Sequence, residues 1–111
     1  MSARRKKVRK GAPPPLGFEW SQRKAHYNEW KHAVSFIEAA TVFGDPNSID
    51  VFDDVHSIDE DRFLLIGMSA RQRLLVVLHT EGRADNIRII GARDVEPTER
   101  RRYEEGEADA G

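Results

Sequence analysis

The chain has 111 residues, of which 39% are hydrophobic and 33% charged, and its net charge at pH 7 is −1. This length predicts one domain, within the usual range of about 100 to 200 residues, and the composition is typical of a globular protein with a small core. The chain has no cysteine, which excludes disulfide scaffolds, thiolate metal sites and cysteine nucleophiles. No apolar run approaches the roughly 18 residues of a membrane span, so a cytoplasmic protein without a membrane partner is expected.

Charge is unevenly distributed along the chain. Residues 1–17 carry six Lys and Arg and no acid, and the remaining residues therefore carry a net charge of −7. This segment contains Pro13-Pro14-Pro15 and has little to bury, which predicts a disordered basic arm. Such an arm either binds phosphates without regard to sequence or is simply solvated. Residues 18–106 are then the folded domain, and residues 107–111 a tail.

The first half of the domain is expected to form two helices. Ser21 is suited to cap a first helix, because its hydroxyl accepts a hydrogen bond from the first turn. Ser35 and Glu38 have the spacing of a capping box that begins a second helix, and Gly44 is typical of its end. The expected elements are an extended segment at Phe18–Trp20 and helices over residues 22–31 and 36–43.

After the second helix the period changes to that of strands. Four apolar or alternating runs rich in Val, Ile, Leu and Phe are separated by short polar stretches, as in an antiparallel meander. The runs are Ser48–Phe52, Arg62–Ser69, Arg73–Thr80 and Asn86–Arg93. The third run is continuously apolar from Leu74 to Leu78, which predicts a central strand covered on both faces. A last helix is expected from Thr98 to about Glu105.

The order of these elements predicts an α+β fold. A short N-terminal strand and two helices pack on an antiparallel sheet of about four strands, and a helix ends the domain. Charge is segregated within this domain as well. The segment Asp45–Asp61 holds seven acids and no Lys or Arg, whereas Arg71–Arg93 holds five Arg and two acids. The second segment is therefore the one suited to an anion.

Much of the domain resembles the BrnT family of toxins. The segments that carry the resemblance are Phe18–Trp20, Lys31–Pro46, His56-Ser57, Gly67–Ser69, Arg73–Val77, Ile87–Arg93 and Glu99–Glu104, together with Lys24, Asn28, Glu60 and Arg62. It implies a RelE-like ribonuclease fold and metal-independent RNA cleavage, without a cofactor, that arrests translation and growth. It also implies a hetero-oligomer with a BrnA-like antitoxin, a ribbon-helix-helix DNA-binding protein through which operator DNA is bound indirectly.

The chain departs from the family pattern at four positions. Ser21 stands where the family usually has Asp, Ala33 where it has Gly, His79 where it often has Tyr, and Gly91 where it often has Ser. Ser preserves the N-cap. Ala33 is strained if the connection between the two helices requires a positive φ. Gly91 lacks a hydroxyl that the family often has at this position.

Cleavage of RNA without a metal requires a base for the 2′-OH, cations for the phosphorane and an acid for the departing 5′-oxygen. Histidine suits the proton transfers because its ordinary pKa lies near neutrality, and arginine suits the phosphate because its guanidinium is forked and permanently charged. The catalytic candidates are His32, His56, Glu60, Arg88 and Arg93. Lys31, Arg71 and Arg73 are expected to bind RNA. The scattered histidines predict no metal site.

Structural alternatives stand beside these roles. His32 near a helix C-terminus also interacts favourably with the helix dipole, and His56 is equally suited to stabilise a turn. The arginines alternatively pair with the acids of Asp45–Asp61. The domain as a whole is either an endoribonuclease or a non-catalytic module that binds RNA or an antitoxin.

Two of the catalytic candidates lie in one expected strand. Simple alternation places Arg88 and Arg93 on opposite faces of that strand. A bulge at Gly91 would instead bring them onto the same face. Convergence of the two guanidinium groups therefore depends on a bulge.

Overall fold

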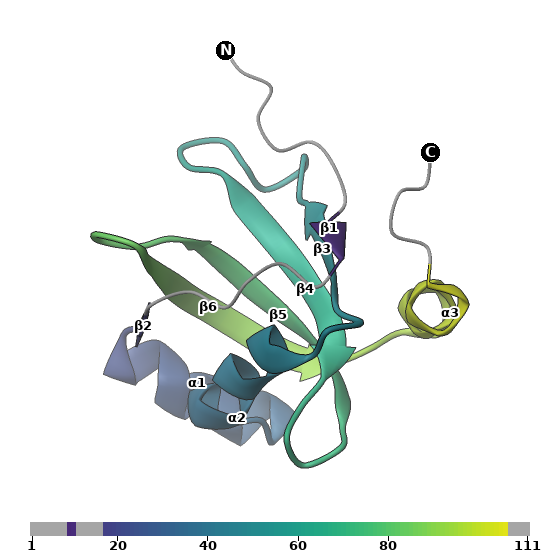
Figure 1. The fold of residues 1–111 in the computed structure, drawn as a ribbon. Coiled ribbons are helices and arrows are strands. Elements are labelled where there is room, and N and C mark those ends of the chain that lie inside the picture. The colour runs from purple at the N-terminus through teal and green to yellow at the C-terminus, as the bar shows by residue number, and fades with distance from the viewer. Residues whose placement is uncertain (1–8, 11–16, 107–111) are drawn as a thin grey trace.

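A computed structural model describes residues 9–10 and 17–106, which form one mixed sheet and three α-helices (Figure 1). The strands are β1 (Arg9–Lys10), β2 (Gly17–Glu19), β3 (Ile49–Phe52), β4 (Arg62–Met68), β5 (Leu74–Glu81) and β6 (Asn86–Asp94). The helices are α1 (Gln22–His32), α2 (Phe36–Thr41) with a 3-10 turn at Val42–Gly44, and α3 (Pro97–Glu105). The α+β class and the order of the predicted elements are confirmed.

The predicted caps explain where the first two helices begin. The Ser21 hydroxyl accepts a hydrogen bond from the Lys24 amide (3.3 Å), and the Ser35 hydroxyl accepts one from the Glu38 amide (3.0 Å). The expected capping box at Ser35 is only half formed, because the Glu38 carboxylate instead binds Arg73. α1 ends at His32 because Ala33 adopts a left-handed conformation (φ 59°).

The sheet has the order β1-β3-β4-β5-β6-β2. The predicted meander is confirmed, since β3 to β6 pair as antiparallel neighbours. The sheet is nevertheless mixed and wider than predicted, because β2 pairs parallel to β6 and β1 pairs antiparallel to β3. The pairing of Arg9–Lys10 differs from the disordered arm predicted for residues 1–17. The rest of that arm up to residue 16 and the tail at 107–111 lie outside the described residues.

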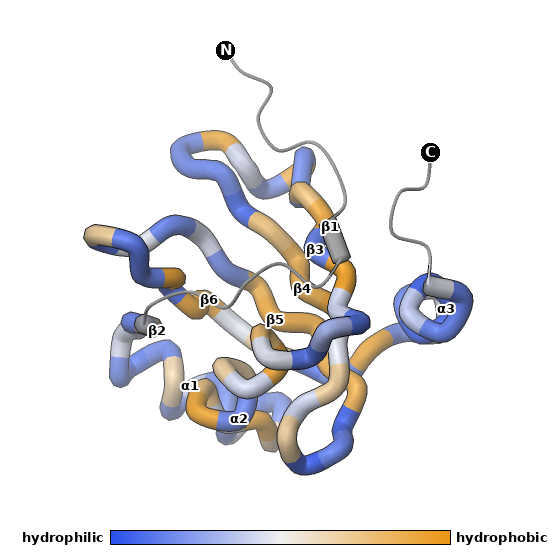
Figure 2. Tube along the Cα trace, viewed as in Figure 1, coloured by the Kyte–Doolittle hydropathy of each residue, from blue (hydrophilic) through white to orange (hydrophobic). Residues whose placement is uncertain are grey.

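The main core lies between one face of the sheet and the first two helices. Its buried members are Val34, Phe36, Ala39, Val42, Leu65, Leu75, Val77, Ile89 and Ala92. Burial of each large aliphatic or aromatic side chain contributes about 1.5 to 3 kcal/mol, so this layer is the principal source of stability. Figure 2 shows the hydrophobic stretches in the sheet and in α2, whereas α3 is largely hydrophilic. None of the helices in the described part of the chain has the length and apolar character that crossing a membrane requires.

The central strand β5 is buried on both faces, as predicted. Residues 74–77 are each at most 6% exposed. α1 and α2 cover one face of the sheet, and α3 lies beside β4 (Figure 1). The Tyr103 hydroxyl of α3 donates a 2.6 Å hydrogen bond to Asp45, and burial together with Asp45 raises the pKa of Tyr103 to about 12. This contact anchors α3.

A bulge in β6 decides the orientation of the two arginines in that strand. Leu78 pairs with Gly91 but His79 pairs with Ile89, so one residue of β6 is extra at this point. Because of this shift Arg88 lies opposite Thr80 and Arg93 opposite Val76, which places both on one face. Four residues of β5 separate them, or roughly 13 Å.

The left-handed conformation of Ala33 leads to a first prediction. Ala33→Gly should stabilise the fold by about 1 kcal/mol, because an L-residue with a Cβ is disfavoured in this region by ~1–2 kcal/mol. Chemical denaturation measures the change in the free energy of unfolding. Ala25→Gly in the middle of α1 is the matched control and should destabilise the fold by about 1 kcal/mol. Equal losses in both variants would contradict strain at Ala33.

Candidate functional site

The candidate residues divide between the two ends of the sheet. Lys31 and His32 lie at the end of α1, near the β4–β5 hairpin that carries Arg71 and Arg73. His56, Glu60 and Arg88 lie near the start of β4, the end of β5 and the start of β6, which meet at the opposite end. A strand as long as β4 spans roughly 20 Å, which is the separation of the two ends. The structure therefore places the expected RNA-binding residues at the same end of the molecule as His32 and at the opposite end from His56.

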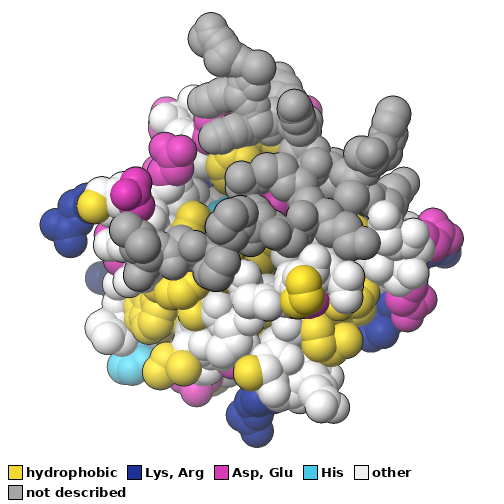
Figure 3. Space-filling view, in the orientation of Figure 1, with side chains coloured by type: hydrophobic (Ala, Val, Ile, Leu, Met, Phe, Trp, Pro, Cys, Tyr) yellow, Lys and Arg dark blue, Asp and Glu magenta, His cyan; other side chains and the backbone are white. Residues whose placement is uncertain are grey.

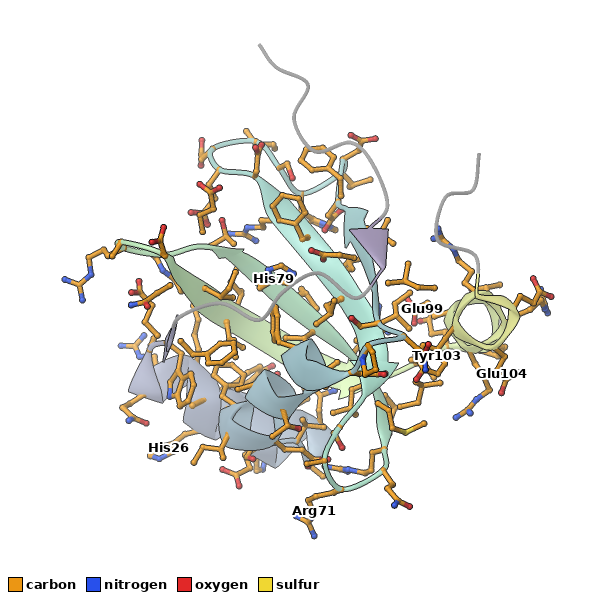
Figure 4. The ribbon with its side chains drawn as sticks, in the orientation of Figure 1. His26, Arg71, His79, Glu99, Tyr103 and Glu104 are labelled. Carbon is orange, nitrogen blue, oxygen red and sulfur yellow. The ribbon has the colours of Figure 1, made fainter. Side chains whose placement is uncertain are left out.

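The distribution of charge follows this division. Figure 4 labels Arg71 at the tip of the β4–β5 hairpin, pointing into solvent. Acidic side chains gather over the β3–β4 loop at the other end of this face (Figure 3). Within the described part of the chain, residues 9–10 and 17–106, no carboxylate forms an ion pair with Lys31 or Arg71. These two cations are therefore available to an external anion.

A buried carboxylate holds the hairpin end together. The side chain of Glu38 is 4% exposed, and its two oxygens accept hydrogen bonds from Arg73 Nη2 (2.6 Å) and Arg73 Nε (3.0 Å). The Ser69 hydroxyl also donates to Glu38 (2.7 Å). The hydrogen bonds from Arg73 lower the pKa of Glu38 despite its burial, and Ser69 and Arg71 act in the same direction. Glu38 is therefore an anion at neutral pH and the fixed partner of Arg73.

Arg73 also fixes the connection between α1 and α2. Its Nη2 atom donates a 2.9 Å hydrogen bond to the carbonyl oxygen of Ala33, the residue that follows His32. Asn28 of α1 supports the same connection, because its amide nitrogen donates to the carbonyls of Val34 and Ala92, each at 2.9 Å. The backbone amide of Ala92 in turn donates to Asn28 Oδ1 (3.0 Å). His32 is half-buried and stands on a rigid support.

The candidates at the opposite end are engaged in structural contacts. His56 Nδ1 lies 2.9 Å from Asp53 Oδ2, while the His56 amide donates to Asp53 Oδ1, so Asp53 caps a turn and also holds the His56 ring. Glu60 pairs with Arg62 at 3.5 Å. Arg88 Nε lies 3.6 Å from a carboxylate oxygen of Glu19. His56 thus has the turn-stabilising geometry of its structural alternative, and Glu60 and Arg88 are both engaged in ion pairs.

Arg93 belongs to the framework that begins α3. Its two terminal nitrogens donate to both oxygens of Glu99, at 2.9 and 3.0 Å. Glu99 also accepts from the Glu96 amide (2.8 Å) as part of a capping box. The pKa of Arg93 is raised, chiefly by the hydrogen bonds to Glu99. Burial raises the pKa of Glu99, but the hydrogen bonds from Arg93 and the Glu96 amide lower it by more, so the net shift is downward.

The alternative in which the candidate arginines pair with the acids of Asp45–Asp61 was wrong for Arg73, Arg88 and Arg93. The structure pairs Arg73 with Glu38, Arg88 with Glu19 and Arg93 with Glu99. None of these acids belongs to Asp45–Asp61. Each pair joins segments that the spacing of charges along the sequence does not relate.

The buried pair of His79 and Asp50 was not anticipated from the sequence. His79 is 3% exposed, and its Nε2 atom lies 2.9 Å from Asp50 Oδ1. The rings of Phe43 and Phe63 flank it, with centroid separations of 4.9 and 5.5 Å. Figure 4 shows His79 within the sheet rather than at its rim. This imidazole supports the core, and no group of three or more His, Asp or Glu in the described ranges has the arrangement of a metal site.

The hairpin end therefore presents an imidazole and two cations on a fixed scaffold. An imidazole transfers protons near neutral pH, and the cations attract a phosphodiester. Arg73 faces inward to Glu38 and Ala33, so its role there is to position the α1–α2 connection. Sequence patterns identified the cations but not which of them serve as internal supports.

Comparison with known proteins agrees with this picture of the domain. The family model described as "Ribonuclease toxin, BrnT, of type II toxin-antitoxin system" matches residues 20–99, which is well over half of the chain. The match extends from the residue before the α1 N-cap into α3 and covers every candidate site residue. No curated protein matches the chain.

The buried carboxylate generates a second prediction. Glu38→Gln should lower the free energy of unfolding at pH 7 by about 1 to 3 kcal/mol, because it removes the charge that satisfies Arg73 and Ser69. The pKa of Glu38 is lowered in the folded state, so its contribution is complete above the ordinary value of 4.5 and is lost as pH falls through the folded value. The difference between wild type and variant should therefore shrink as the pH falls below this range.

Urea unfolding at a series of pH values measures this difference. Glu104→Gln is the matched control, because Glu104 forms an exposed pair with Arg100 at 3.7 Å on α3. Removal of such a pair changes stability by less than about 1 kcal/mol. A difference for Glu38→Gln that stays constant down to acid pH would contradict an ionised Glu38.

Proposed function

Because the chain belongs to the BrnT family, the ribonuclease toxins of type II toxin-antitoxin systems, we propose that it is a metal-independent endoribonuclease that cleaves RNA in the cytoplasm and arrests translation. The observation that carries the choice of site is the group formed by His32, Lys31 and Arg71. An accessible imidazole stands there beside cations that no carboxylate of the described residues neutralises. Cleavage by the neighbouring 2′-OH needs cations at the phosphate and groups that transfer protons near neutral pH, and these residues offer the cations and one such group.

Each residue of the proposed site has one task. Lys31 and Arg71 bind the scissile phosphate and stabilise the charge that develops on it. His32 carries one of the two proton transfers, either from the 2′-OH or to the departing 5′-oxygen, and solvent water carries the other. The 2′-oxygen forms a bond to phosphorus as the bond to the 5′-oxygen breaks, so the products are a 2′,3′-cyclic phosphate and a 5′-OH. Arg73 positions the backbone after His32.

The remaining candidates lie outside this proposed site. His56 and Glu60 stand near the far end of the sheet, and Arg88 is paired with Glu19. Arg93 supports the start of α3 through Glu99. An arginine held by two hydrogen bonds to a carboxylate must break both before it binds a phosphate, which disfavours Arg93 as the primary contact.

Membership of a type II family gives the protein a protein antitoxin as its partner. We propose that this antitoxin is BrnA-like, a ribbon-helix-helix protein that neutralises the toxin in a hetero-oligomer and links it to operator DNA. RNA is the substrate of the free toxin. A non-catalytic module that binds RNA or the antitoxin is the alternative.

A third prediction tests the nuclease and its site. The wild-type protein in EDTA should cleave total RNA at discrete positions and leave 2′,3′-cyclic phosphate ends. His32→Gln should lower the cleavage rate by about 10² to 10⁴, which is the usual contribution of one positioned proton transfer. Growth arrest on expression of the free toxin should weaken in parallel.

His26→Gln provides the matched control, because His26 lies on the same helix, is exposed and is outside the proposed site. Its activity should equal that of the wild type. Binding of RNA without cleavage by the wild type would support the non-catalytic alternative. Full activity in His32→Gln, with loss in His56→Gln, would move the site to the other end of the sheet.

A further inference from the structure

The outer face of α1 carries two aromatic rings among cations. The inner face is defined by burial, since Ala25 and His32 are half-buried and Asn28 is buried. At 3.6 residues per turn, Arg23, Tyr27 and Trp30 lie opposite this inner face, Lys24 and Lys31 lie on the flank beside Tyr27, and His26 and Glu29 lie on the flank toward α2. The first five of these residues, all exposed, form the outer face. It holds three cations and two aromatic side chains, and the acid Glu29 lies on the flank beyond it.

The two rings form a pair on the surface. Tyr27 is 55% exposed and Trp30 is 80% exposed, so neither serves the core. Their ring centroids lie 5.9 Å apart with an interplanar angle of 43°. The ammonium of Lys31 lies 5.8 Å from the centroid of Tyr27, within reach of a cation–π interaction. The ring of Trp30 is thus largely open to solvent, and the charge of Lys31 lies over its neighbour Tyr27.

A tryptophan as exposed as Trp30 is unusual, and the residues around it indicate what kind of molecule binds there. Protein interfaces are also enriched in Trp, Tyr and Arg, but they are depleted of lysine, of which this face has two. A surface of cations and flat rings without acids is the composition of single-stranded nucleic acid sites, in which bases stack on rings and cations follow the backbone. The only acid of α1, Glu29, is on the side that faces α2, where it lines a shallow groove with Phe36 and Ile37. Charge therefore favours an RNA strand.

The position of this face relates it to the proposed cleavage site. Lys31 belongs to both, and by helical angle it lies between the aromatic pair and His32. Trp30 and Tyr27 precede His32 by two and five residues, or roughly 3 to 8 Å along the helix axis, but they lie about 160° and 140° around the helix from it. A strand that reaches from His32 to the rings therefore crosses the width of a helix, roughly 10 to 12 Å. At about 3.4 Å per nucleotide, a base on these rings would belong to a nucleotide about three or four positions from the scissile phosphate.

We propose that the outer face of α1 is a base-stacking surface that binds unpaired nucleotides of the RNA substrate a few positions from the cleaved bond. Trp30 and Tyr27 stack bases, while Arg23, Lys24 and Lys31 contact the backbone. The surface favours single-stranded RNA, because bases within a duplex cannot reach the rings. The inference rests on the proposed nuclease function and names the form of its substrate.

The experiment uses the fluorescence of Trp30 in the full chain. Trp20 is half-buried against Phe36, with ring centroids 5.8 Å apart, so Trp20→Phe leaves Trp30 as the sole tryptophan. The probe is a single-stranded oligodeoxynucleotide of mixed sequence, which lacks the 2′-OH and is not cleaved. Stacking should quench the fluorescence in a saturable manner. Inorganic polyphosphate, which has charge but no bases, should bind without quenching.

In the fourth prediction, Trp30→Ala and Tyr27→Ala each weaken binding of the oligonucleotide at least about fivefold, because stacking on an aromatic ring contributes about 1 to 3 kcal/mol per base. Affinity of these variants is measured by anisotropy of a labelled strand. Ile37→Ala is the matched control, since Ile37 is 71% exposed but belongs to α2 and not to the outer face. Its affinity should equal that of the wild type.

The outcomes separate this surface from the nuclease function. Cleavage of RNA by the wild type, together with unchanged affinity and no quenching at Trp30, would overturn the stacking surface and leave the nuclease intact. Quenching that depends on Trp30 without any cleavage supports the surface while the nuclease proposal fails. Loss of antitoxin binding in Trp30→Ala, with no response to the oligonucleotide, would assign the face to a protein partner and overturn the inference.

Discussion

The ionised carboxylate of Glu38 is the constraint on which the hairpin end of the molecule depends. A buried carboxylate without partners is expensive, so the surrounding chain must supply donors. Arg73 and Ser69 do so from the start of β5 and the end of β4, and the same guanidinium reaches the carbonyl of Ala33. One anion therefore ties α2, the β4–β5 hairpin and the end of α1 into a single unit.

This unit has consequences for the residues around it. Because Arg73 is committed to Glu38, it cannot freely follow a substrate, whereas Arg71 two residues earlier projects from the turn. Ala33 accepts strain at φ 59° so that its carbonyl and that of Val34 meet Arg73 and Asn28. A local cost in backbone conformation is thus offset by hydrogen bonds that fix the position of His32.

Much of the fold follows from local sequence signals, and the site follows from them only in part. Ser21 and Ser35 cap helices through contacts three residues away, and β3 to β6 show apolar runs, so short-range patterns were sufficient to predict them. The parallel pairing of β2 with β6 joins residues about 70 positions apart and leaves no mark on local periodicity. The fate of Glu38 was missed for the same reason, since its spacing from Ser35 matches a capping box while its partners lie more than 30 residues away.

The arginines illustrate why composition alone does not locate a site. Four of the five in Arg71–Arg93 are paired with carboxylates, Arg73 with Glu38, Arg83 and Arg88 with Glu19, and Arg93 with Glu99. These three glutamates come from three different elements, so the pairs join β2, α2 and α3 to the sheet. A cation that neutralises a fixed carboxylate contributes little field to the solvent, so the potential that attracts a polyanion comes from the cations that remain. Among the described residues those include Lys31 beside His32 and Arg71 on the hairpin, as well as Arg23 and Lys24 at the start of α1 and Arg101 on α3. The arrangement of ion pairs, rather than the number of basic residues, therefore leaves Lys31 and Arg71 without a neutralising carboxylate at the hairpin end, where their field favours an anion.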